Sequence, residues 1–171
     1  LAPTFVELAG LPVEPHVTGR SIAGLILGRE DSVRRDAVFL ERERHANVRR
    51  GDLSYPVRGI RPKDFLYLWN LRPDRWPAGD PELYHSVGPY GDVDLSPLKD
   101  LLVGGTARPD LALYRALALE RRPPEELYDL RADPTEVKNL AEDPAHRPVL
   151  ERMRAELTQF RKDTRDPWID N

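Results

Sequence analysis

The hydrophobic pattern is clearest in the middle of the chain, where residues 55–61 and 64–70 read YPVRGIR and DFLYLWN. Successive side chains of a strand point to opposite faces, so the second run places Phe65, Tyr67 and Trp69 together on one face. The Pro-Lys-Asp sequence at the junction is typical of a turn. The pattern therefore predicts a β-hairpin.

Two further runs have the length and composition of strands. Residues 37–41 (AVFLE) form a compact apolar run, which predicts a buried, central strand. Residues 125–130 (EELYDL) predict another short strand. Together with the hairpin, they predict a small antiparallel sheet of about four strands.

The last third of the chain predicts a long amphipathic helix. It begins with Asp143 as N-cap, runs to about Lys162, and repeats apolar residues three or four positions apart. A small antiparallel sheet packed by a long C-terminal helix gives an α+β fold class. The residues expected to face the sheet are Val149, Leu150, Met153, Leu157 and Phe160.

Shorter helices are predicted over residues 2–9, after Ser96 as N-cap, over residues 109–121 and as one capped turn within residues 132–143. The inward faces are expected at Leu98, Leu101 and Leu102 in the second of these, and at Leu111, Tyr114, Leu117 and Ala118 in the third.

Composition excludes several classes of protein. The chain has 171 residues, a net charge of -3 and no cysteine, so it has the size of about one domain and no disulfide or thiolate site. The acidic balance argues against nucleic-acid binding. No apolar run reaches the length of a membrane span, so we expect no membrane insertion. The first ten residues do not resemble a signal peptide, and we expect the chain to begin within a longer protein. Localisation is not readable from these features.

Several segments carry a family resemblance. Residues 1–12 (LAPTFVELAGLP) and 18–27 (TGRSIAGLIL) resemble the end of the large domain of sulfatases in the alkaline phosphatase superfamily. Residues 126–144 (ELYDLRADPTEVKNLAEDP) resemble a C-terminal segment of the same family. Residues 54–71 (SYPVRGIRPKDFLYLWNL) and 163–170 (DTRDPWID) are similar to the heparan N-sulfatase, or sulfamidase, branch.

The resemblance implies a division of the chain and of its chemistry. Residues 1–35 would be the last helix and loop of an N-terminal α/β domain, and residues 36–171 a C-terminal domain that closes one side of the substrate pocket. Formylglycine and calcium would belong to the upstream catalytic domain, the chain's implied partner. We therefore expect no catalytic residue, no metal ligand and no bound cofactor in this chain.

One short motif could suggest otherwise. Residues 54–58 (SYPVR) match Ser-x-Pro-x-Arg, the spacing of the sulfatase nucleophile signature. The family signature continues differently after its Arg and begins a helix, whereas Arg58 here lies in a predicted strand. We therefore expect Ser54 to be non-catalytic, Arg58 to pair with a carboxylate of the fold, and Trp168 to hold the terminus against the domain.

Substrate-binding residues are expected in two segments. The first, LERERH, follows the strand at residues 37–41, and its Glu43, Arg44 and His45 could reach a sugar or its leaving group. The alternative is a solvated run of charges at a strand end.

The second segment lies in residues 71–95, a long irregular stretch rich in Pro, Gly and Asp. Arg75 could bind a sulfate or carboxylate, Trp76 could lie against a pyranose ring, and Asp74 adjoins both. The alternative is an ordered surface loop anchored by Trp76.

These features leave three functions open. The first is the C-terminal region of a sulfatase acting on sulfate esters or N-sulfates of a glycan. The second is a phosphonate or phosphate monoester hydrolase of the same superfamily. The third is a non-catalytic interaction module. An exposed apolar patch around residues 1–27 is expected in each case, and with it a homo-oligomer.

Overall fold

A computed structural model describes residues 1–29, 35–44, 46–82, 88–106 and 108–170. The chain forms two compact units, Leu1–Asp36 and Ala37–Asn171. None of the described helices is long and apolar enough to cross a membrane.

The first unit contains two short helices, α1 (Ala2–Leu8) and α2 (Ala23–Ile26). They are connected through the buried Thr4, whose hydroxyl accepts a hydrogen bond from the Ile22 N–H at 3.0 Å. The helix expected at residues 2–9 is therefore present. Large apolar side chains nevertheless remain exposed on this unit, at Leu1, Phe5, Leu8, Leu11, Leu25, Ile26 and Leu27.

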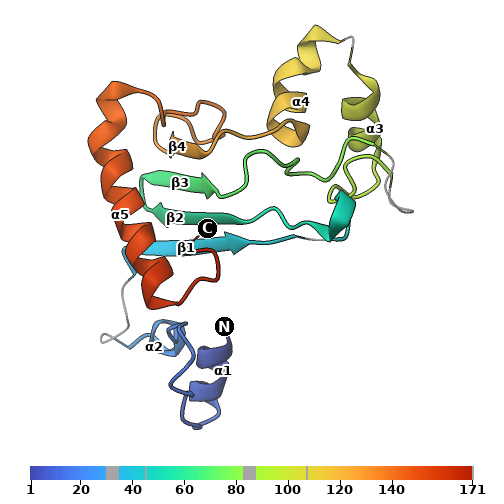
Figure 1. Cartoon of the computed structure of the whole chain (residues 1–171). Helices are drawn as coiled ribbons and strands as arrows, with labels where there is room; N and C mark the ends of the chain where they lie inside the picture. The colour runs from blue at the N-terminus through green and yellow to red at the C-terminus, as the bar shows by residue number, and fades with distance from the viewer. Residues whose placement is uncertain (30–34, 45, 83–87, 107, 171) are drawn as a thin grey trace. The chain divides into compact units, whose positions relative to one another are not determined.

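The second unit is built on a four-stranded antiparallel sheet in the order β1-β2-β3-β4 (Figure 1). Its strands are β1 (Ala37–Arg42), β2 (Val57–Pro62), β3 (Phe65–Asn70) and β4 (Glu125–Asp129). The predicted hairpin is β2–β3.

One face of the sheet packs against the long C-terminal helix α5 (Arg147–Asp163). Phe39 of β1 and Phe160 of α5 stack with ring centroids 3.8 Å apart. Phe65, Tyr67 and Trp69 share one face of β3, as predicted, and this face packs against the helix. The α+β fold class is confirmed, and the core consists of Ile60, Tyr67, Leu127, Leu140, Leu150, Met153 and Leu157.

Two more helices, α3 (Pro97–Gly104) and α4 (Ala112–Leu119), lie beside each other and away from α5 (Figure 1). Ser96 caps α3, because its hydroxyl accepts a hydrogen bond from the Lys99 N–H. These helices share a second core with the loop before them, formed by Ala78, Tyr90, Leu102 and Leu119. Single 3-10 turns are found at Arg50–Asp52, Pro109–Leu111 and Pro144–His146.

The position predicted for β1 was wrong. The strand forms, but it is an edge strand of the sheet rather than a central one, and Val38 and Leu40 are partly exposed. An unbroken apolar run does not distinguish a buried strand from an edge strand whose outer face is uncovered, because both require the same residue types.

The inward faces predicted for α3 and α4 were also partly wrong. Leu98 is 63% exposed and Tyr114 is 60% exposed, whereas Leu102 and Leu119 are buried. Residues 111–119 read LALYRALAL, so apolar side chains surround the helix and the period does not select one face.

The helical turn predicted within residues 132–143 does not form; the segment is a series of turns. The Asp133 carboxylate accepts hydrogen bonds from the N–H groups of Val137 and Lys138, at 2.8 and 2.7 Å. The side chain of Asn139 accepts another from the Leu127 N–H, which ties the segment to β4. Side-chain caps therefore replace the helical hydrogen bonds here.

Candidate functional site

The first predicted group of site residues lies just beyond the end of β1. The Glu43 carbonyl accepts a hydrogen bond from the Tyr55 N–H at 2.6 Å, and the Arg44 guanidinium donates to the Asp52 carbonyl at 2.8 Å. These bonds close the base of the loop between β1 and β2. His45, the third member of the group, lies outside the described residues.

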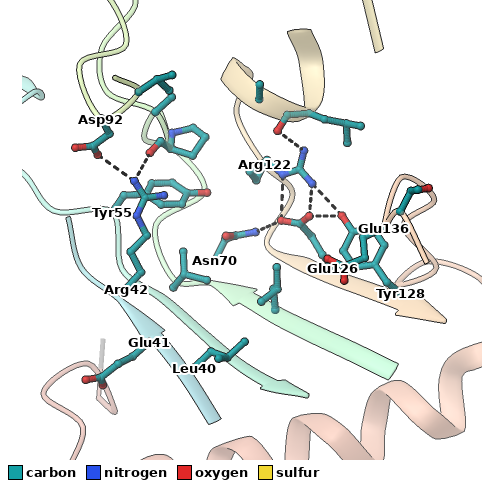
Figure 2. Close-up of a pocket in the computed structure, with 18 residues that line it drawn as sticks. Leu40, Glu41, Arg42, Tyr55, Asn70, Asp92, Arg122, Glu126, Tyr128 and Glu136 are labelled. Atoms are coloured by element: carbon teal, nitrogen blue, oxygen red, sulfur yellow. Dashed lines mark hydrogen bonds and ion pairs between the residues drawn. The ribbon is translucent and has the colours of Figure 1, made fainter. Parts of the chain in front are cut away.

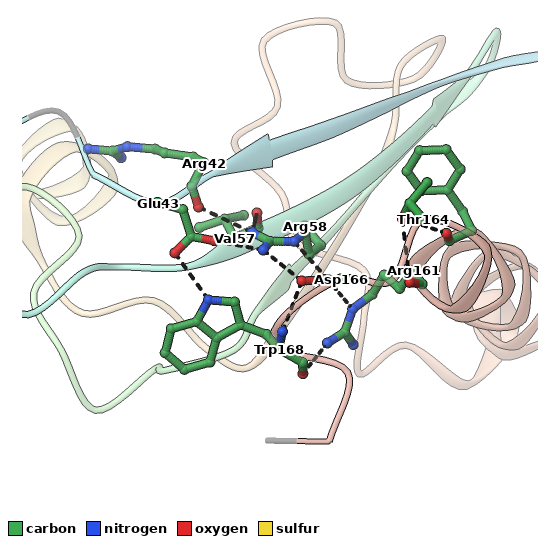
Figure 3. A network of polar contacts seen from close by, with 9 residues as sticks. Arg42, Glu43, Val57, Arg58, Arg161, Thr164, Asp166 and Trp168 are labelled. Carbon is green, nitrogen blue, oxygen red and sulfur yellow. Dashed lines mark hydrogen bonds and ion pairs between the residues drawn. The ribbon is translucent and has the colours of Figure 1, made fainter. Parts of the chain in front are cut away.

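Glu43 belongs to a polar network that joins β1, β2 and the end of α5 (Figure 3). One oxygen of its carboxylate lies 2.6 Å from Arg58 Nη2, and the other accepts a hydrogen bond from Trp168 Nε1 at 3.2 Å. Asp166 binds Arg58 through both oxygens, each at 2.9 Å, and Arg161 Nε at 2.7 Å. Both predictions for Arg58 and Trp168 are therefore confirmed.

The electrostatics of this network stabilise the carboxylate form of Asp166. Burial alone would raise the pKa of Asp166, but hydrogen bonds from Arg58 and Arg161 outweigh it and lower the pKa to about 2. Glu43 lies at the edge of the same network and is half-exposed. Because both of its oxygens already have partners, Glu43 is placed to hold the loop that begins at its own position.

The second predicted group lines a cavity of about 390 Å³, which we call the arginine cavity. It brings Asp74, Arg75 and Trp76 together, as their sequence neighbourhood suggests. It also adds residues from the 49–53 turn and from the end of α4. Its lining residues are Arg49, Arg50, Leu53, Asp74, Arg75, Trp76, Asp80, Pro81, Glu82 and Arg121.

The carboxylates of the arginine cavity have partners of their own. Asp74 pairs with Arg72 at 3.4 Å, and Glu82 pairs with Arg50 at 3.3 Å. Asp80 accepts a hydrogen bond from the Arg50 N–H at 2.9 Å. These acids are therefore engaged by the loop that carries them or by the neighbouring turn.

The guanidinium groups of Arg75 and Arg121 differ from the others of the arginine cavity in their contacts. Arg75 donates to the Ser54 carbonyl at 2.7 Å, and partial burial together with the nearby charge of Arg72 lowers its pKa. Arg121 lies over the ring of Trp76, 4.9 Å from the ring centroid. Within the described part of the chain, neither guanidinium forms an ion pair with a carboxylate.

The ring of Trp76 is partly engaged. Arg121 covers one face, and Tyr90 meets the ring edge with centroids 6.1 Å apart. The Trp76 carbonyl accepts a hydrogen bond from the buried Arg49 at 2.7 Å. Contact between Trp76 and a pyranose ring remains a prediction, and the arrangement leaves less of the aromatic surface free than the sequence suggested.

A larger cavity, of about 600 Å³, lies on the sheet face opposite α5 (Figure 2). Of the substrate-binding residues expected from the sequence, none that the structure describes lines it. Its floor is formed by side chains from all four strands, including Leu40, Val57 and Leu68. The Tyr55 hydroxyl is buried in this region without a hydrogen-bond partner among the described residues. Burial raises the pKa of Tyr55 to about 12.

The charged groups of this larger cavity are compensated. Glu126 accepts hydrogen bonds from Asn70 at 2.7 Å and from Tyr128 at 2.5 Å, and it forms an ion pair with Arg122 (Figure 2). Burial would raise the pKa of Glu126, but the Arg122 hydrogen bonds outweigh it and lower the pKa. Because Arg122 also donates a hydrogen bond to the Leu117 carbonyl of α4, the network connects β4 to α4. The period-two pattern of β3 could have indicated this polar site, since Leu68 and Asn70 share one face.

The described part of the chain was also compared with the requirements of a metal site. Within those residues, no group of three or more His, Asp or Glu is placed to hold a metal ion.

No protein-family model matches the chain. Among curated relatives, the chain is 30% identical over 179 aligned positions to N-sulphoglucosamine sulphohydrolase of Homo sapiens. The alignment covers 99% of this chain and 32% of that protein. The chain is 27% identical over 168 positions to an ulvan-active sulfatase of Formosa agariphila, covering 93% of this chain and 24% of the relative. The chain thus spans about a quarter to a third of the relatives it matches.

Solved structures share the fold at lower identity. A 2-O GAG sulfatase superposes with a TM-score of 0.59 and 21% identity, over 98% of this chain and 25% of that one. A protein in complex with its substrate D-glucosamine-2-N,6-O-disulfate superposes with a TM-score of 0.55 and 18% identity, over 99% and 25%. The phosphonate monoester hydrolase of Agrobacterium radiobacter superposes with a TM-score of 0.53 and 20% identity, over 95% and 24%.

The structural likeness establishes the fold alone, which sulfatases and a phosphonate monoester hydrolase share. Both curated relatives are sulfatases, and the alignments cover nearly all of this chain. The recognition made from the sequence segments is confirmed: over nearly its whole length the chain is similar in sequence to curated sulfatases and shares its fold with sulfatase structures, which supports a C-terminal part of a sulfatase.

Proposed function

We propose that the chain is the C-terminal region of a sulfatase that hydrolyses sulfate esters or N-sulfates of a glycan. In this proposal, residues 36–171 close one side of a substrate pocket whose catalytic groups belong to a domain upstream of Leu1. The observation that carries the proposal is the 30% identity to N-sulphoglucosamine sulphohydrolase across 99% of the chain. The name of that relative also motivates a sulfated glucosamine as the first substrate to test.

The chemistry of sulfuryl transfer is assigned to the upstream domain. The reaction needs an activated oxygen nucleophile and a cation that holds the sulfate oxygens. We assign both, as formylglycine and calcium, to that domain. The side chain of Ser54 is proposed to be non-catalytic, because its segment leads into strand β2 instead of beginning a helix.

This chain would supply the wall of the pocket. The loop after β1, with Glu43 and Arg44, and the arginine cavity, with Asp74, Arg75 and Trp76, are the two parts proposed to face the glycan. Both groups of polar side chains lie on loops held by ordered hydrogen bonds, which is how substrate-positioning residues are commonly supported.

A second candidate is hydrolysis of phosphonate or phosphate monoesters. The phosphonate monoester hydrolase of Agrobacterium radiobacter has the same fold over 95% of this chain. Sulfate and phosphonate groups are both tetrahedral and anionic, so the wall of the pocket does not by itself separate them. The upstream nucleophile does: a Cys or Ser in a C/S-x-P-x-R motif indicates a sulfatase.

The test is an activity panel with the protein encoded when the reading frame is extended upstream of Leu1. We expect hydrolysis of a sulfated glucosamine in preference to phenyl phosphonate, and loss of activity when the upstream motif Cys or Ser is replaced by Ala. A Ser54→Ala variant is the matched control and should retain activity. Preference for the phosphonate would favour the second candidate, and loss of activity in Ser54→Ala would overturn the assignment of the nucleophile.

A further inference from the structure

We propose that Arg75 and Arg121 form an anion-binding site in the arginine cavity, which holds a sulfate or carboxylate group of the glycan other than the one that reacts. The inference rests on the proposed function for the identity of the ligand. It adds Arg121, a residue at the end of α4 that no sequence pattern singled out.

The charge of the cavity supports an anion as its ligand. Among the lining acids, Asp74 pairs with Arg72 and Glu82 pairs with Arg50, whereas Asp80 accepts a hydrogen bond from the backbone N–H of Arg50. Arg49 is neutralised by Asp92 at 2.7 Å. Arg75 and Arg121 remain as the guanidinium groups without a carboxylate partner in the described part of the chain. An anion that reached them would therefore meet two guanidinium groups that no carboxylate of the described residues occupies.

The geometry of Arg121 leaves its donors available. The Cζ atom of Arg121 lies over the ring of Trp76, 4.9 Å from the ring centroid, and the Arg121 guanidinium has no hydrogen bond to another described residue. Arg75 commits one nitrogen, Nη1, to the Ser54 carbonyl. Both side chains can thus present a planar pair of N–H donors, the arrangement that suits a sulfate or carboxylate.

The surroundings hold the site in place. Arg49 is 2% exposed and binds the carbonyls of Trp76 and Pro77, each at 2.7 Å. Gly79 then turns the chain with φ at 97°, where an added Cβ would lie 2.8 Å from Val48. The backbone beside Arg75 is therefore rigidly supported, which lowers the entropic cost of binding.

The bound group is not the reacting one, because the described lining offers no chemistry for its cleavage. It contains no hydroxyl, thiol or imidazole side chain. The site would instead recognise a second negative charge on the substrate. A sulfate and a uronic acid carboxylate could both satisfy it, so the experiment must distinguish these two sources.

The experiment measures binding to the 171-residue chain by NMR titration at low ionic strength. The probes are glucosamine N-sulfate, glucuronate and inorganic sulfate, with N-acetylglucosamine as the uncharged comparison. We expect the anionic probes to bind and to shift the side-chain Nε signal of Arg121. The tighter of the N-sulfate and the glucuronate identifies the group recognised.

Arg121→Gln is the decisive variant for anion binding, because Arg121 is exposed and its replacement should not disturb the fold. Loss of one charged hydrogen-bonding partner should weaken anion binding about tenfold or more. Arg75→Gln should do the same, and Arg75→Lys should partly restore binding. The matched control is Arg131→Gln, an exposed arginine outside the cavity that pairs loosely with Asp64 at 3.7 Å.

The proposal would be overturned by three results: no binding of any anion, equal binding of N-acetylglucosamine, or equal losses in Arg121→Gln and Arg131→Gln. These outcomes differ from failure of the proposed function, because the assay requires no catalysis. A protein that binds the anions here but releases no sulfate after upstream extension would refute the sulfatase activity and leave the anion site standing.

Discussion

At the scale of single residues, hydrogen-bond satisfaction separates two buried tyrosines near the larger cavity. Tyr55 has a hydroxyl without a partner among the described residues, whereas the Tyr128 hydroxyl bonds with Glu126 and Arg122. We expect Tyr55→Phe to leave the free energy of unfolding unchanged or slightly higher. Tyr128→Phe should lower the free energy of unfolding by about 1–3 kcal/mol, because the buried Glu126 and Arg122 would each lose a hydrogen bond. Urea unfolding of both variants measures this; equal losses would contradict the assignment.

Asp166 provides a second prediction at this scale. Asp166→Asn would leave Arg58 and Arg161 buried without their shared anion, at a cost of about 3–5 kcal/mol. Asp163→Asn is the matched control, because the Asp163 side chain is exposed and, among the described residues, accepts a hydrogen bond only from Gln159. A similar loss of stability in both variants would argue against a central role for the Asp166 network.

The pKa of Asp166 adds a pH signature. The folded pKa of Asp166, about 2, lies below the usual aspartate pKa of 3.8, so its contribution to stability is present above pH 4 and is lost as the pH falls through about 2. The difference in unfolding free energy between the wild type and Asp166→Asn should therefore narrow between pH 5 and pH 2. A difference independent of pH would contradict this linkage.

At the scale of elements, the C-terminal tail acts as a clamp on the end of β1. Removing residues 167–171 would keep Asp166, delete Trp168 and release Glu43 from one partner. We expect faster hydrogen exchange at the Tyr55 amide, which bonds with the Glu43 carbonyl, and little change at Ile60 in the sheet centre. Equal acceleration at both amides would indicate global destabilisation instead.

Elements also show how far the sequence predicts this protein. The hairpin and α5 follow from strict periods of two and of three to four, because each buries one face against the other. The edge position of β1 and the buried side of α4 do not, since they depend on which neighbour covers each element. The arginine cavity was half predicted: Asp74, Arg75 and Trp76 are consecutive, whereas Arg121 reaches it only through the fold.

At the scale of the whole molecule, the exposed apolar residues of the first unit lead to a prediction about association. Phe5, Leu25 and Ile26 are each at least 60% exposed. Large exposed apolar patches mark interaction sites, so we expect the 171-residue chain to self-associate as its concentration rises. Ile26→Glu should weaken this association, which sedimentation velocity would detect. A clean monomer at high concentration would contradict the prediction.

The central claim is that this chain is the pocket-closing part of a sulfatase whose chemistry is carried upstream. The most direct measurement is release of inorganic sulfate from glucosamine N-sulfate, compared between the isolated chain and the protein extended upstream of Leu1. The account predicts no sulfate from the isolated chain and steady release from the extended protein. Sulfate release by the isolated chain, or an extended protein that folds but releases none from N-sulfated or O-sulfated sugars, would contradict it.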